Sequence, residues 1–364
     1  PRYTEKIKEL ICVGEDGSLW HDMRYFGYHY SRNDTLSTAF EEHFGRPRRD
    51  PKESDKSLDP YYCDMAASIQ AVTEEVLLKM LRHLHEVSGG MKSVCLSGGV
   101  ALNSVANARI LRETPFEELY IQPSAGDGGG ALGAALFAWH CALGNSKRFV
   151  MDHASWGQEY SVDEMRSALD KSGIKADYVE DTSKLLEMTV DRLTSGKVIG
   201  WHQGRFEWGP RALGNRSILA DPRQAAMKDV VNTKIKFREP FRPFAPAVLA
   251  DSAKEYFDLS EVDRHLAARF MLLVVPVRDE KQDAIPAVNH LGTARIQTVY
   301  PESTPLYHRV IQGFGDATGV PILLNTSFNV RGEPIVNTPE DALNTFLVSG
   351  IDTLVMGNFF IDKT

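Results

Sequence analysis

The segment from Gly204 to Ala247 places the tightest constraint on how this chain folds. Its arginines alternate with glycine, proline and aromatic residues, as in Gly204–Arg216 and Lys236–Pro246, and they do not recur at the spacing of a helix face. Proline fixes the backbone of a loop, and glycine lets the backbone come close to a ligand. The segment therefore predicts two ordered, arginine-bearing loops joined by a helical spacer.

The charge of this segment is opposite to that of the whole chain. Between Arg205 and Arg242 there are nine Lys/Arg and four Asp/Glu, a local charge of +5, whereas the 364 residues together carry −8. Guanidinium forks suit planar oxyanions such as phosphate and carboxylate. The alternative is a solvated basic surface, but such a surface is normally rich in lysine and poor in Trp, Phe and Pro. The segment therefore predicts an anion site.

Length and composition narrow the class of protein. A chain of 364 residues is too long for one ordinary core, which predicts two domains. A pI near 5.8 argues against nucleic acid as the main partner. The four cysteines are scattered without a CxxC pair, which predicts reduced, mostly buried thiols in a cytoplasmic protein. The longest apolar run is too short to span a membrane.

Two consecutive segments share one plan, a short strand followed by a glycine-rich turn and a helix. The first turn contains Gly98, Gly99 and Asn103, and the second, Ser124–Gly130, contains Asp127 among its glycines. Backbone amides at such a turn can face a phosphate, although tight turns also need glycine for steric reasons alone. Two turns in succession favour a nucleotide or metal site. Asp127 is either a metal ligand or a plain helix cap, and the sequence leaves both open.

The regions around these motifs give a coarse map of the chain. A hairpin is predicted over residues 10–23, a surface loop over 46–60 and a long amphipathic helix from Ala66 to Leu84. In the second half, strands are predicted over 197–201, 270–277 and 320–324, helices over 165–172, 183–195 and 339–348, and one last strand over 353–361. The strand at 320–324 runs into a turn rich in hydroxyl and amide side chains, which is either a set of ligand donors or an ordinary strand exit.

Taken together, these motifs resemble the O-carbamoyltransferases of the NodU/CmcH/TobZ type. The glycine turns resemble the second half of an ASKHA-type (actin/sugar-kinase-like) domain, and the basic segment with Gly292–Arg295 and Ser327-x-Asn329 resembles a YrdC-like domain. The resemblance implies an α/β fold in which residues 1–155 form the C-terminal part of an ASKHA-like carbamoyl-transfer domain. Residues 156–364 would form a YrdC-like domain that synthesises carbamoyl-adenylate.

The resemblance also implies a two-step activity. ATP and carbamoyl phosphate would give carbamoyl-adenylate, phosphate and pyrophosphate, and the carbamoyl group would then pass to a hydroxyl of a sugar or natural-product acceptor. Mg²⁺ would assist the first step. The catalytic residues implied are Lys236, Arg211 and Arg295. Nucleotide and phosphate contacts are implied for Arg238, Ser327, Asn329, Gly98, Gly99, Asn103, Gly128 and Gly129.

The sequence departs from the family at its metal site. The family holds an iron-type ion with closely spaced histidines and an aspartate that matches Asp127, yet none of the 11 histidines here forms such a pair. A single carboxylate cannot hold Fe²⁺ tightly. We therefore expect the first half of the ASKHA domain to come from a longer polypeptide or a separate chain. On that expectation, this chain binds ATP but transfers carbamoyl poorly.

Two other functions fit parts of the sequence. A YrdC-like synthase of threonylcarbamoyl-adenylate for tRNA modification would use the same basic segment, but it needs no ASKHA-like half. A non-catalytic nucleotide-binding module is the second alternative. A hydrogenase-maturation carbamoyltransferase is disfavoured because its CxxC pairs are missing, and a sugar kinase because it leaves residues after 160 unexplained.

Overall fold

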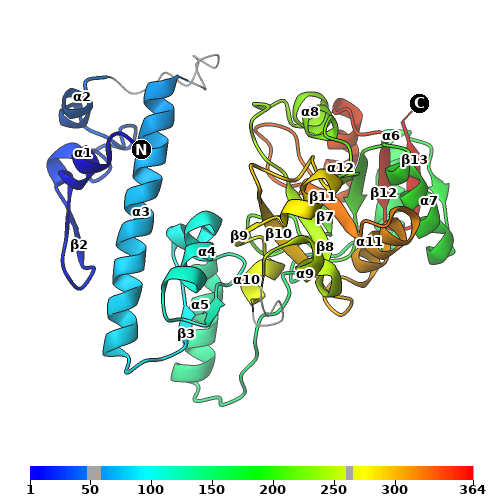
Figure 1. The fold of residues 1–364 in the computed structure, drawn as a ribbon. Helices are drawn as coiled ribbons and strands as arrows, with labels where there is room; N and C mark the ends of the chain where they lie inside the picture. The colour runs from blue at the N-terminus through cyan, green and yellow to red at the C-terminus, as the bar shows by residue number, and fades with distance from the viewer. Residues whose placement is uncertain (47–58, 260–264, 364) are drawn as a thin grey trace. The chain divides into compact units, whose positions relative to one another are not determined.

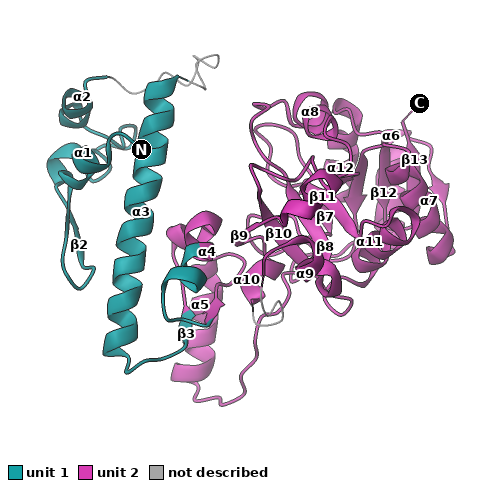
Figure 2. Ribbon diagram, in the orientation of Figure 1, with its two compact units in different colours: residues 1–94, 109–117 teal, residues 95–108, 118–364 magenta. Residues whose placement is uncertain are grey.

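The computed structural model describes residues 1–46, 59–259 and 265–363 (Figure 1). The predicted loop at 46–60 lies almost wholly outside these residues. The chain divides into two compact units, residues 1–94 with 109–117 and residues 95–108 with 118–364 (Figure 2). These units divide the chain elsewhere than at residue 155, so the predicted domain boundary stays a prediction. No helix of the described residues is long and apolar enough to cross a membrane.

The first unit is built on one long helix. α3 (Pro60–Val87) begins at Asp59, whose side chain caps the amide of Tyr61, and it ends just before two glycines with positive φ, as predicted. Its buried stripe meets the short elements α1 (Thr4–Lys8) and α2 (Thr38–Phe44) in a small core of Ile7, Leu10, Phe44 and Val72. The hairpin of β1 (Ile11–Val13) and β2 (Leu19–His21) confirms the prediction for residues 10–23.

The second unit contains a nine-stranded mixed sheet in the order β5-β13-β12-β6-β7-β11-β8-β10-β9. The strands are β5 (Asp177–Tyr178), β6 (Ile199–His202), β7 (Arg216–Ala220), β8 (Ala245–Leu249), β9 (Leu273–Pro276), β10 (Thr293–Val299), β11 (Ile322–Ser327), β12 (Thr353–Met356) and β13 (Phe359–Asp362). Only β12–β6 and β10–β8 pair in parallel; the other pairs are antiparallel. The predicted α/β class is therefore confirmed, whereas the ASKHA-like and YrdC-like assignments stay predictions.

Helices cover this sheet. α7 (Thr182–Thr194) and α11 (Pro305–Thr318) pack on one face over Ile199, Trp201, Leu219, Leu323 and Val299. α6 (Val162–Ser172) packs against α12 (Pro339–Val348), which also contacts β6. Both α6 and α12 begin with a capping box, Ser161 with Glu164 and Thr338 with Asp341. The start of α12 agrees with the prediction, whereas α6 begins three residues before the predicted 165.

The shorter elements of this unit include α8 (Met227–Val231), α9 (Ala253–Tyr256) and α10 (Leu266–Arg269). The glycine-rich segments add β3 (Ser93–Cys95), α4 (Ser104–Glu113), β4 (Glu118–Tyr120) and α5 (Gly129–Phe137), of which β3 and α4 cross the unit boundary.

Several sequence predictions need correction. The predicted last strand is two antiparallel strands, β12 and β13, because Gly357 turns the chain between them with φ 54°. Strand β7 lies within the basic segment, where the sequence predicted only loop and spacer. All four cysteines are free, as expected, but they are exposed and not buried.

Candidate anion site

The basic loop Gly204–Asn215 joins β6 to β7 and is organised by one buried carboxylate. Glu207 is 3% exposed, and its Oε1 accepts hydrogen bonds from the amides of Leu213 (2.9 Å), Asn215 (2.7 Å) and Arg216 (3.1 Å). Buried amides need acceptors, and a carboxylate oxygen is a strong one. Glu207 therefore fixes the turn that follows Arg211.

Side chains on the strands β10 and β11 donate hydrogen bonds to backbone carbonyls of the same loop. Asn325 on β11 donates to the carbonyl of Ala212 (3.1 Å), and Gln297 on β10 donates to the carbonyl of Leu213 (2.7 Å). Asn325 also donates to Oε1 of Gln297 (2.8 Å), so the two amides brace each other. The loop comes close to the core at Gly214, whose φ is 110° and where a Cβ would lie 2.1 Å from the ring of Tyr307.

One face of the sheet is apolar at one end of its strands and polar at the other. Cross-strand pairing puts Leu323 level with Ala247 and Gln297, and Ser327 level with Ser217, so odd-numbered residues of these strands share the face under α7 and α11. At one end of this face Leu219, Leu323 and Val299 join the apolar core. At the other end it carries polar side chains, namely Arg295, Gln297, Asn325 and Ser327.

Lys236 reaches this polar end from a π-helical turn, Asn232–Lys236, at the end of α8. Its Nζ donates to Oγ of Ser327 (3.0 Å), to the carbonyl (3.0 Å) and Oδ1 (2.6 Å) of Asn329, and to the carbonyl of Ser327. The residue is 5% exposed. Burial lowers the pKa of Lys236 to about 7, and the positive charge of Arg238 lowers it further in the same direction.

Three arginines are linked to Lys236 through their charges: Arg238 acts on Lys236, and Arg211 and Arg238 act on Arg295. Burial, followed by repulsion from Arg211 and Arg238, lowers the pKa of Arg295 to about 9. Burial, followed by Arg242, lowers the pKa of Arg238 to about 10, with Glu239 acting in the opposite direction. Burial alone lowers the pKa of Arg211. We call Arg211, Lys236, Arg238 and Arg295 the cation cluster.

The cation cluster has almost no internal neutralisation. In residues 1–46, 59–259 and 265–363, no carboxylate forms an ion pair with any of its four members, although Arg205, Arg223 and Arg242 nearby in sequence each have one. The Nε atom of Arg211 is buried without a hydrogen-bond partner, while Arg238 is held by Asn232 Oδ1 (2.7 Å) and lies over the ring of Phe244 at 4.6 Å. Lys236 is buried and the three arginines are half-buried. Unpaired positive charge in such a setting is costly, and an oxyanion with several charges would offset that cost.

The structure thus brings together the six residues predicted in the second half. The ammonium group of Lys236 is hydrogen-bonded to Ser327 and Asn329. The positive charges of Arg211 and Arg238 lower the pKa of Arg295, which places these arginines near one another. Which part of the ligand each cation binds, the ATP phosphates or the carbamoyl donor, remains a prediction.

The predicted nucleotide contacts in the glycine turns lie in a different setting. The amide of Gly98 donates to the carbonyl of Ala125 (2.8 Å), and that of Gly129 to Gly126 (3.0 Å), so both are used within the protein. Oδ1 of Asn103 accepts the amide of Ala106 (3.2 Å) as a helix cap. Gly99 has open space where a Cβ would stand, and a Cβ at Gly128 would meet only the Ser124 hydroxyl, at 3.0 Å. Phosphate binding by these turns stays a prediction.

The residues around Asp127 do not provide the ligands that an iron ion needs. The side chain of Asp127 is exposed, and no three His, Cys, Asp or Glu residues of the described chain lie close enough to hold a metal. A tight transition-metal site needs three or more such ligands. We therefore assign no chemical step to a metal bound at Asp127.

The basic loop also touches the second glycine turn within the same unit. Gly209 has φ 110°, and a Cβ there would lie 2.5 Å from the carbonyl oxygen of Pro123, which directly precedes Ser124. Only glycine allows this approach.

Sequence reasoning missed four residues that shape this site: Glu207, Gln297, Asn325 and Arg216. Gln297 and Asn325 occupy buried positions on otherwise apolar strands, and such polar residues are a usable signal because burial requires hydrogen-bond partners. Arg216 is fully buried on the opposite face and donates to the carbonyls of Gln203 (2.7 Å) and Asn337 (3.2 Å). Its role is structural, although its sequence context is that of the anion site.

Comparison with known proteins gives two family matches. Residues 3–136 match a family model described as the carbamoyltransferase N-terminus, and residues 190–363 match the carbamoyltransferase C-terminus. A solved structure of full-length HypF in a phosphate- and nucleotide-bound form aligns over 48% of this chain and 21% of that chain, at 16% identity and a TM-score of 0.33. That likeness is too weak to carry an argument.

Proteins of similar sequence come from several bacteria. An uncharacterized Synechocystis protein, sll1178, is 41% identical over 100% of this chain and 62% of its own length. The nodulation protein NolNO of Sinorhizobium fredii is 43% identical over 82% of this chain and 44% of its own length. The 3'-hydroxymethylcephem-O-carbamoyltransferase of Streptomyces clavuligerus is 28% identical over 98% of this chain and 65% of its own length. The chain thus spans between 44% and 65% of these relatives.

Proposed function

This chain belongs to the carbamoyltransferase family, and from that premise we propose that its cation cluster binds ATP and a carbamoyl donor and forms carbamoyl-adenylate. The adenylate would then give its carbamoyl group to a hydroxyl of a small-molecule acceptor. The observation that carries the proposal is the convergence of Arg211, Lys236, Arg238 and Arg295 from three separate segments, with no ion-paired carboxylate among the residues that the structure describes.

The first step balances as a phosphoryl-group substitution. Water hydrolyses carbamoyl phosphate to carbamate and inorganic phosphate, and a carbamate oxygen then attacks the α-phosphorus of ATP. The bond from that phosphorus to the β-phosphate oxygen breaks, and pyrophosphate leaves. Negative charge grows on the phosphoryl oxygens and on pyrophosphate, so fixed positive groups in a water-poor site lower the barrier. ATP would arrive with Mg²⁺, which would share this neutralisation.

The geometry suggests different tasks for the cations. Lys236 is held by four oxygens of Ser327 and Asn329, which orient its ammonium group. Nε of Arg211 is buried without a partner among the described residues, and Arg295 carries the repulsion of Arg211 and Arg238, so we assign these two forks to the donor and the developing charge. Arg238 is stacked and hydrogen-bonded, which suits a fixed contact to the nucleotide phosphates.

The second step needs the acceptor hydroxyl to attack the carbamoyl carbon as AMP leaves and the hydroxyl proton is lost. A mixed anhydride of this kind is open to hydrolysis, so a short protected path between the two steps is an advantage. The contact of Gly209 with Pro123 joins the basic loop to the glycine turns and is where we place that path. One relative is named for O-carbamoylation of a hydroxymethyl cephem, which favours an oxygen acceptor here as well.

The test is exchange of radiolabelled pyrophosphate into ATP. We expect exchange that depends on carbamoyl phosphate, and a loss of at least 100-fold in Lys236→Met, because the buried ammonium group sits among the proposed phosphate contacts. Lys234→Met is the matched control. Lys234 belongs to the same helical turn but is exposed, so this variant should keep exchange within twofold of wild type.

A second arm separates the competing activity. Threonine with bicarbonate should not support exchange. Exchange that requires threonine and ignores carbamoyl phosphate would reassign the chain as a threonylcarbamoyl-adenylate synthase. Equal exchange in Lys236→Met and wild type would remove the adenylation proposal altogether.

A further inference from the structure

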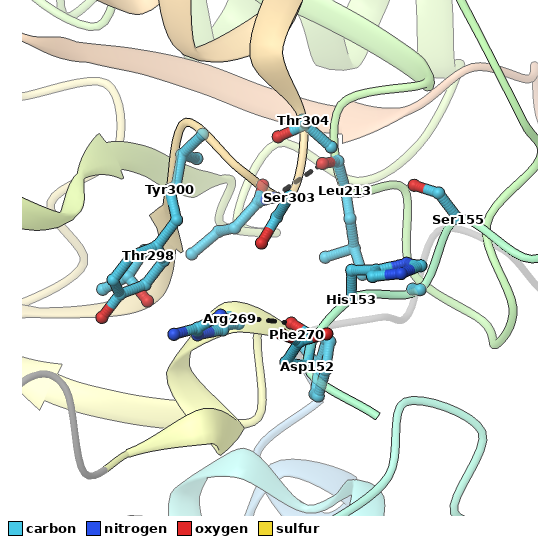
Figure 3. A pocket seen from close by; sticks show the side chains of 13 residues that line it. Asp152, His153, Ser155, Leu213, Arg269, Phe270, Thr298, Tyr300, Ser303 and Thr304 are labelled. Carbon is cyan, nitrogen blue, oxygen red and sulfur yellow. Dashed lines mark hydrogen bonds between the residues drawn. The ribbon is translucent and has the colours of Figure 1, made fainter. Parts of the chain in front are cut away.

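A second hollow lies in the same unit, where β10 ends and α11 begins (Figure 3). No member of the cation cluster lines it. Its walls come from four segments of the chain, namely 152–155, 269–270, 297–300 and 303–304, together with Leu213. The hollow is small and open to solvent, so it admits a ligand of only a few heavy atoms.

The start of α11 forms one wall. This helix has 14 residues, its first turn contains no acidic side chain, and the N-cap Thr304 makes no capping hydrogen bond through its side chain. The first amides of a helix point outward with partial positive charge, and an anion stabilises them when no side chain does. By itself this feature is common.

A cation stands among the lining residues as well. The guanidinium of Arg269 lies 3.7 Å from the centre of the Tyr300 ring, and its hydrogen bond to the backbone oxygen of Asp152 is long, at 3.4 Å. Within the described part of the chain, Arg269 has no ion pair. Stacking fixes the fork while leaving most of its donors unused.

Buried polar atoms without partners complete the hollow. Thr298 is 2% exposed, and its Oγ1 has no hydrogen-bond partner among the described residues; the same holds for Oγ of Ser303 and Nδ1 of His153. The His153 ring is fixed by stacking on Trp156, with centroids 4.6 Å apart and planes 14° apart. Buried polar groups normally have partners, so several orphans around one hollow indicate an absent ligand.

From these observations we propose that this hollow is a second anion site, which takes one small oxyanion of the size of phosphate, bicarbonate or a short carboxylate. Arg269 and the first turn of α11 would supply the positive charge. Ser303, Thr298 and His153 would supply hydrogen bonds. The proposal does not depend on the adenylation step.

The site is coupled to the basic loop through one residue. Leu213 lines the hollow, and its carbonyl accepts the hydrogen bond from Gln297 that also fastens the loop carrying Arg211. An oxyanion bound here would therefore stabilise the loop in the conformation seen.

The test is equilibrium dialysis with radiolabelled inorganic phosphate, with acetate and bicarbonate as competitors to identify the favoured class of anion. We expect two classes of phosphate site in wild type. Arg269→Met and Ser303→Val should each weaken one class at least tenfold, whereas Lys236→Met should weaken only the other. Arg278→Met is the matched control, because Arg278 is an exposed arginine that also donates to a backbone carbonyl (Lys254, 2.8 Å).

Loss of folding and loss of the second anion site can be distinguished. Unfolding curves show whether each variant is folded; should Arg269→Met fail to fold, Ser303→Val and His153→Gln decide the question, since both keep the stacked arginine. A single class of phosphate site, removed by Lys236→Met and untouched by Ser303→Val and His153→Gln, would overturn the proposal. So would an equal loss in Arg278→Met.

Discussion

The cation cluster and the glycine turns were both predicted to bind phosphate, yet the structure builds them in opposite ways. The cluster gathers side chains from a loop, a helical turn with the residues that follow it, and one strand, and the loop is braced by Glu207, Gln297 and Asn325. The glycine turns are local, and the amides of Gly98 and Gly129 are bonded within the protein. The cation cluster carries positive charge without ion pairs among the described residues, whereas the amides of Gly98 and Gly129 in the glycine turns already have hydrogen-bond partners.

The difference teaches where a binding prediction gains its strength. A glycine turn has the same sequence whether its amides face a ligand or a neighbouring carbonyl. An arginine withdrawn from water that has neither a carboxylate nor the backbone carbonyls that hold Arg216 has fewer explanations, because the cost of removing its charge from water must be offset by something. Unpaired charge is therefore the stronger indication of a ligand, and three experiments test this comparison.

The largest effect is expected at Glu207. Replacing it by leucine would leave the amides of Leu213, Asn215 and Arg216 buried without their acceptor, and each such loss costs about 1–3 kcal/mol. We expect urea unfolding to show a loss of about 3 kcal/mol or more, with pyrophosphate exchange lowered at least tenfold. Glu207→Gln keeps one acceptor oxygen and should recover part of both. Glu187→Leu, at an exposed position of α7, is the control. An equally stable Glu207→Leu would show that the loop is not organised as described.

A smaller effect is expected from pH, through Lys236. Its pKa is lowered from 10.5 to about 7 in the folded protein, so between these values the unfolded chain holds a proton that the native protein lacks. Stability should therefore rise with pH across this window relative to Lys236→Met. Binding of pyrophosphate needs the protonated form, so affinity should fall up to tenfold per pH unit above 7.

The measurement for this prediction is calorimetry in two buffers of different ionisation enthalpy. Above pH 7 we expect proton uptake on binding by wild type and by Lys234→Met, but not by Lys236→Met. The absence of proton uptake in wild type would contradict the lowered pKa of Lys236.

The smallest effect is expected in the glycine turns. Gly99 has room for a Cβ and no positive φ, and Asp127 is exposed and belongs to no group of three metal-binding side chains among the described residues. Gly99→Ala and Asp127→Asn should each leave pyrophosphate exchange and stability within about twofold and 0.5 kcal/mol of wild type, as for surface substitutions. A tenfold loss of exchange in either variant would place these turns in the adenylation site and erase the contrast with the cation cluster.

Much of the fold could be predicted where local chemistry decides it. Helix α12 begins and ends where the sequence placed it, because Thr338, Pro339 and Asp341 form a capping box with a first-turn proline. Strand β7 was missed because its five residues follow a run of glycine, proline and arginine that reads as loop. The start of β13 was missed because Gly357 and Asn358, which turn the chain between two apolar runs, lie within the one strand that the sequence predicts there.

By itself the sequence determined the chemistry of the site: an excess of arginine and lysine in loops pinned by glycine and proline, with Ser327 and Asn329 after an apolar strand. It could not determine which cations would be left unpaired, because that depends on strand register. The register puts Arg295, Gln297, Asn325 and Ser327 on one face and sends Arg216 to the other, where backbone carbonyls surround it. Only tertiary packing gathers the first group at one place where, among the described residues, Arg295 has no ion-paired carboxylate and none of the backbone carbonyls that hold Arg216. A clustered cation that the protein itself leaves unpaired is what indicates a binding residue.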